Sequence, residues 1–181
     1  MEVEEAEEAA ELQFERGLYQ VAEQQYSNFD ISKIFNRVGG NVNYSLKHFK
    51  NATLLHLAVS EENYSLGSSL LAINADPNLF DDFGRTPIAV ACVFGLDKAV
   101  EILLSDPRTK VATKFFVKHL PAAHPLFLAI DQGFPRVVEL LLRDKEKVVG
   151  YEPGYEGHHP FHYACLQKEG VDVVRLMLDV A

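Results

Sequence analysis

The chain has 181 residues, 48% of them hydrophobic, which fits one domain with a continuous core. Its net charge is −9, and seven of these charges come from Glu residues that precede Arg16, so the remainder carries −2. We therefore expect no general nucleic-acid-binding face. We also expect no secretory signal or presequence in so acidic an N-terminus, and no apolar run reaches the roughly 20 residues of a membrane span.

The first 50 residues are expected to form an acidic helix followed by a degenerate terminal unit. Residues 1–16 are predicted to be helical and to continue into a helix at 17–25. A second helix at 31–38 and an exit turn at 39–43 complete the unit. The apolar residues Leu12, Leu18, Tyr19 and Ala22 are expected to share the face of the helix that packs on the repeat. The Glu residues between Glu2 and Glu15 are expected to stay on the outer face. The Glu run is interpreted as a solvated face or frayed tail, with a docking site for a basic partner as the alternative.

A short motif then recurs four times. Copies begin at Thr53, Thr86, His124 and His159, which are 33, 38 and 35 residues apart. Each copy is followed by a second apolar run. Self-similarity near this period is typical of stacked helix pairs.

The second copy shows why these residues favour a helix pair. Gly84 suits a turn with positive φ. Thr86 can cap a helix whose first residue is Pro87, and Gly95 can end that helix in the left-handed region. Ala91 is small enough to let a neighbouring helix approach. A second helix is predicted over 97–104.

These motifs resemble the T-P-L-H-x-A turn of the ankyrin-repeat family, which is nearly whole at 53–58, 86–91 and 159–164. The segment 74–78 is similar to the family's inter-repeat segment, with Asn74 in the left-handed position usually given to Gly. The resemblance covers about residues 51–181. It implies an all-α solenoid of helix-turn-helix units with projecting hairpin or loop fingers. The four repeats are expected at about 51–80, 81–118, 119–153 and 154–181.

Residues that suggest chemistry are better explained by the repeat. His158, His159, His162 and Cys165 have metal-ligand types, but Pro160 puts His158 before the helix, and the repeat itself accounts for the other two histidines. Cys92 and Cys165 are expected to be buried thiols set by packing, not nucleophiles. We expect no enzyme activity, no metal and no cofactor. Reduced cysteines indicate the cytoplasm, with the nucleus as the alternative.

The resemblance implies that the chain binds another protein or peptide through its concave face. Departures from the repeat mark the candidate binding residues, because packing does not dictate them. The aromatic candidates lie at the expected fingertips: Phe80, Phe83, Phe115, Phe116, Tyr151 and Tyr155. Packing between adjacent fingers is the alternative explanation for them. The basic candidates are predicted to steer an acidic segment of the partner: Arg85, Lys114 and Lys118.

The predicted function is therefore a scaffold or adaptor module. The alternative is a regulatory N-terminal domain of a larger ion channel or signalling enzyme. Leu176, Met177 and Leu178 lie close to Ala181 with no polar capping unit after them. We therefore expect either a segment of a longer protein or a partner that covers this end. The sequence gives no indication of oligomeric state.

Overall fold

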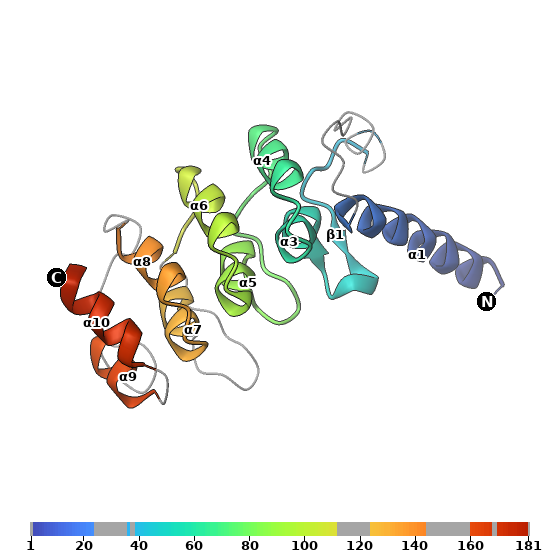
Figure 1. Cartoon of the computed structure of the whole chain (residues 1–181). Coiled ribbons are helices and arrows are strands. Elements are labelled where there is room, and N and C mark those ends of the chain that lie inside the picture. Colours follow the sequence, from blue (N-terminus) through green and yellow to red (C-terminus); the bar gives the residue numbers. More distant parts are fainter. Residues whose placement is uncertain are drawn as a thin grey trace.

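The computed structural model describes residues 2–23, 36, 39–111, 124–143, 160–167 and 170–180. In this part of the chain, short helices follow one another in a row with α1 at one end and α10 at the other (Figure 1). The helices are α1 Glu2–Glu23, α3 Leu54–Ser60, α4 Tyr64–Ala72, α5 Pro87–Phe94, α6 Asp97–Ser105, α7 Pro125–Asp131, α8 Pro135–Arg143, α9 Pro160–Leu166 and α10 Val171–Val180. The predicted all-α solenoid is confirmed. None of these helices combines the length and apolar character that crossing a membrane requires.

The helix boundaries follow the predicted signals. At the start of α5 the Thr86 hydroxyl accepts a hydrogen bond from the Ala89 N–H at 3.4 Å, and Pro87 is the first helical residue. At its end Gly95 has φ 69°, and the turn residue Gly84 before the helix has φ 70°. Local sequence therefore determines where this helix begins and ends.

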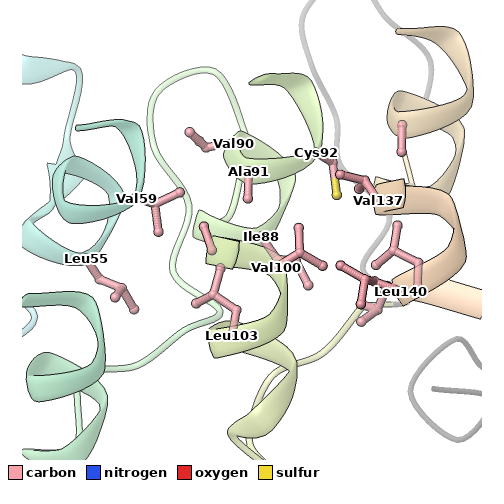
Figure 2. Close-up of a cluster of buried hydrophobic side chains, with 14 of the residues drawn as sticks. Leu55, Val59, Ile88, Val90, Ala91, Cys92, Val100, Leu103, Val137 and Leu140 are labelled. Atoms are coloured by element: carbon pink, nitrogen blue, oxygen red, sulfur yellow. The ribbon is translucent and has the colours of Figure 1, made fainter. Parts of the chain in front are cut away.

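One hydrophobic core runs along the row. The α3 side chains Leu55 and Val59 face those of α5 and α6, and the latter face α8 (Figure 2). The core positions Leu103 and Leu141 are buried, as is the small residue Ala91. Each helix pair buries its apolar side chains against the pairs beside it, which is how stacked repeats gain stability.

Asparagine side chains link successive units near the fingers. Asn43 Oδ1 accepts a hydrogen bond from the Asp76 N–H at 2.8 Å, and Asn78 Oδ1 accepts one from the Lys110 N–H at 2.8 Å. Asn74 has φ 68°, so the predicted left-handed position is confirmed. These bonds give two backbone N–H groups an acceptor within the protein, which they would otherwise lack.

The first finger is a small hairpin. Strands β1 (Ser45–Leu46) and β2 (Ala52–Thr53) pair antiparallel, and the short helix η1 (Lys47–Phe49) joins them. The hairpin lies beside α3 (Figure 1). It fills the connection before the first motif copy, which is longer here than before Thr86.

The prediction that the whole Glu run stays outside is wrong at Glu15. The helix α1 confirms residues 2–23 of the helix predicted over 1–16 and its continuation over 17–25, and Leu18 and Ala22 are buried against the row. Glu15 is also fully buried. Its carboxylate accepts hydrogen bonds from the Lys47 N–H at 2.7 Å and the His48 N–H at 2.8 Å, which compensates for the loss of water.

The prediction of two buried thiols is right for Cys92 and wrong for Cys165, which is exposed. Both residues follow the small Ala of their motif copy. Cys92 on α5 is covered by the next helix pair, whereas no later pair within the described residues lies against α9. The predicted helix at 31–38, Asn36 apart, lies outside the described residues.

Candidate functional site

A groove of about 360 Å³ lies between the first two fingers and the helices α3 and α5. The first finger and the 79–85 connection both lie beside these helices (Figure 1). Apolar and basic side chains dominate its lining, which consists of His48, Phe49, Lys50, Ala52, His56, Leu57, Ser60, Asp81, Phe83, Arg85, Val90 and Phe94. We call this set of residues the groove.

The second finger is the connection at residues 79–85. It forms one wall of the groove, and the carboxylate of Asp81 fixes its shape. Asp81 Oδ1 accepts hydrogen bonds from the Phe83 N–H at 2.9 Å and the Arg85 N–H at 2.8 Å. Asp81 Oδ2 accepts from Arg85 Nε at 2.9 Å and Nη2 at 2.7 Å. The guanidinium also lies over the Phe83 ring, 4.6 Å from its centroid. Arg85 thus holds Phe83 in place while its own charge is balanced by Asp81.

The floor contains a neutral histidine. His56 Nδ1 accepts from the Thr53 N–H at 3.1 Å, so Nε2 carries the proton and donates to the Arg85 carbonyl at 3.0 Å. Burial lowers the pKa of His56 below its usual value. His56, the histidine of the first motif copy, is thus a structural link between α3 and the second finger.

The first finger forms the opposite wall. His48 Nδ1 donates to Glu15 Oε2 at 2.8 Å, so α1 holds this ring. The Lys50 ammonium is exposed and forms no ion pair with any described residue. Lys50 and Arg85 bring two positive charges to the groove, against the one carboxylate of Asp81. The lining residues therefore carry one positive charge in excess, that of Lys50, and the carboxylate of Glu15 lies against His48 at the same wall.

The sequence predictions missed Phe94, which is 56% exposed at the end of α5. At the equivalent position, eight residues after each motif start, the other copies carry Glu61, Gln132 and Gln167. A phenylalanine among polar residues was the signal that could have identified it, because an exposed aromatic side chain is not needed for packing the repeat.

The structure brings together some of the predicted binding residues. Phe83, 46% exposed, and Arg85 line the groove. Phe80 is 49% exposed on the same finger but does not line it. The remaining candidates lie outside the described residues: Lys114, Phe115, Phe116, Lys118, Tyr151 and Tyr155.

Of the residues weighed for metal or thiol chemistry, the structure describes Cys92, His162 and Cys165. His162 is exposed on α9, and His158 and His159 lie outside the described residues. Within the described ranges no three His, Cys, Asp or Glu side chains are arranged to hold a metal ion. Burial raises the pKa of the Cys92 thiol well above its usual value, which disfavours the reactive thiolate.

Comparison with known families agrees with the arrangement of the helix pairs. The family model for ankyrin repeats, in three copies, matches residues 18–115, more than half of the chain. The chain belongs to the ankyrin-repeat family. The match begins within α1, so it includes part of the segment that the sequence suggests is a degenerate terminal unit. Ankyrin repeats bind other proteins, and the groove of this ankyrin-repeat chain lies within the matched region.

Proposed function

We propose that this ankyrin-repeat chain is a non-enzymatic scaffold or adaptor module that holds a partner protein or peptide through its concave face. The observation that carries the proposal is the pair Phe83 and Phe94. Both are about half exposed, and both line one groove with an apolar floor and basic walls. Exposed aromatic side chains gathered at one place are typical of binding sites.

The interface is proposed to extend along the row from this groove. The aromatic and basic fingertip candidates Lys114, Phe115, Phe116, Lys118, Tyr151 and Tyr155 belong to later units of the repeat. An acidic segment of the partner would complement Lys50 and the basic residues of the 108–118 stretch. Such charge complementarity mainly raises the association rate and the specificity of binding.

We place the module in the cytoplasm, with the nucleus as the alternative. Cys92 and Cys165 are both free thiols, and an exposed free thiol such as Cys165 is typical of proteins in a reducing compartment.

Affinity capture with the intact chain tests the function. Proteins retained by it are compared with those retained by the double variant Phe83→Ser/Phe94→Gln, and by a second variant, Phe115→Ala/Phe116→Ala. Each protein that is lost in a variant is purified, and its affinity is remeasured by calorimetry. Circular dichroism confirms that the variants keep the fold.

The proposal predicts at least one purified partner whose affinity falls about tenfold or more in one of the two variants. A partner that binds all three chains equally would show that the concave face is not the interface. Turnover of a substrate by the purified chain would contradict the non-enzymatic assignment.

A further inference from the structure

The groove has the dimensions and the lining of a pocket for one large side chain. Its volume of about 360 Å³ falls at the small end of the range for ligand sites. Leu57, Val90 and Ala52 provide an apolar floor, and Phe83 and Phe94 stand at its edges. A partner side chain placed among these groups would remove apolar area of its own and of both rings from water, which favours binding.

The charged residues of the groove determine which charge the partner should carry next to its apolar side chain. Arg85 is paired with Asp81, and His48 uses Nδ1 to hold Glu15. Lys50 is the basic residue of the groove that has no ion-pair partner among the residues that the structure describes. A partner carboxylate next to the apolar side chain would therefore meet the Lys50 ammonium.

The charge of the rest of the chain makes this preference specific. Seven of the nine net negative charges come from Glu residues of α1 that precede Arg16, so α1 repels an acidic segment, which would be held only where the local charge is positive. A basic segment would instead be attracted to the Glu residues of α1 and away from the groove.

Resting on the proposed function, we infer that the groove binds a short acidic linear segment of the partner. One large apolar side chain of that segment inserts between Phe83 and Phe94, and an adjacent Asp or Glu pairs with Lys50. The anchor supplies most of the binding free energy, because a desolvated apolar contact is worth more than an exposed ion pair.

A displayed library of random linear peptides, selected on the intact 181-residue chain, is the probe. The selected peptides are then tested on the Phe94→Gln variant, which gives α5 the residue that two other copies carry at this position. We expect the selected peptides to share a Phe, Leu or Trp with an Asp or Glu within about three positions. Affinities of the best peptides are then measured by fluorescence polarisation at low and high salt.

Three variants separate the two contributions. Phe94→Gln should weaken the selected peptides about tenfold or more. Lys50→Glu should weaken them about fivefold at low salt, and the effect should shrink at high salt because screening weakens an exposed ion pair. Leu166→Ala is the control: Leu166 is an exposed apolar residue at the end of α9 and does not line the groove, so the affinity should not change.

Several results would overturn the inference. They are a selection that returns no peptide, peptides that are basic or lack an apolar residue, and affinities that Phe94→Gln leaves unchanged. Concentration-dependent self-association that Phe94→Gln abolishes would assign the groove to a second copy of this chain instead. In each case a purified partner that depends on Phe115 and Phe116 would leave the proposed function standing, so the two failures are distinguishable.

Discussion

The helix pairs α5–α6 and α9–α10 are built on the same sequence pattern but have different surroundings. The first pair contacts helix pairs on both sides, α3–α4 and α7–α8. The second contacts α7–α8, and no further pair in the described part of the chain. Accordingly Cys92 is buried, whereas Cys165, at the equivalent position, is exposed.

The different exposure of Cys92 and Cys165 shows that the direction of a side chain and its burial have separate causes in a repeat. The motif determines which side chains point toward the following unit, and it does so equally in both pairs. Whether such a side chain is buried depends on the unit that covers it, because a repeat contacts only its neighbours. Interior pairs should therefore be more stable and less accessible than the α9–α10 pair, and the following measurements test that expectation.

Thiol reactivity should show the largest difference. In the native state Cys165 should react with a disulfide reagent at the rate of an exposed thiol. Cys92 should react more slowly by about a thousandfold or more, because it needs an opening of the row. Absorbance kinetics measure both phases. The Cys165→Ser variant should keep only the slow phase, and a fast phase from Cys92 would show that the interior pair opens readily.

Equivalent core truncations should differ by about a factor of two. Leu103 on α6 and Met177 on α10 are both six residues after the first residue of their helix. Leu103→Ala should cost about 4 kcal/mol, since Leu103 is enclosed on both sides, and Met177→Ala about 2 kcal/mol. Urea denaturation gives both values. Equal losses would mean that α10 is as firmly packed as α6.

Acidification should destabilise the interior through His124. Its Nδ1 accepts from the Leu126 N–H at 3.2 Å at the start of α7, and burial lowers its pKa to about 4. As the pH falls below about 6.5, the ordinary pKa of histidine, His124 becomes protonated in the unfolded chain but stays neutral in the folded chain. Stability should therefore be lost between pH 6.5 and about 4, by up to about 3 kcal/mol.

The His124→Asn variant isolates this contribution. Asn also caps helices but does not titrate, so thermal unfolding of the variant should depend less on pH over this interval. The same pH profile in His124→Asn and the unmodified chain would refute the assignment.

The smallest expected effect is a gain in stability. Gly67 lies inside α4 at the position that Val100 and Val138 hold in later units, and an added Cβ would meet no atom within 4 Å. Gly67→Ala should stabilise the chain by about 1 kcal/mol. Gly95→Ala should destabilise it, because Gly95 has φ 69° and a Cβ would lie 2.7 Å from the Phe134 ring. Thermal melting compares the two.

The fold could be predicted from the sequence where local chemistry decides. Thr86, Pro87 and Gly95 set the limits of α5 through their own backbone preferences. The repeated motif identified the helix pairs and the core positions Leu103 and Leu141. These features depend on spacing along the chain, which the sequence displays directly.

The groove could be predicted only in part, because it depends on contacts between distant segments. Phe83 and Arg85 stand out as departures from the repeat, and Phe94 would have done so by the same comparison. Nothing in the sequence near Glu15 shows that its carboxylate meets the backbone of Lys47 and His48. That contact follows from how α1 packs against the first finger, and an acidic run by itself indicates solvation.

The buried carboxylate of Glu15 makes the binding properties of the groove dependent on α1, which does not itself line the groove. His48 belongs to the groove, and its backbone and ring both donate to that one side chain. A protease that cuts α1, or a ligand that pulls this helix away, would leave those donors without their acceptor and would release the first finger. The cell could then lower the affinity of the module for its partner without touching any residue that the partner contacts.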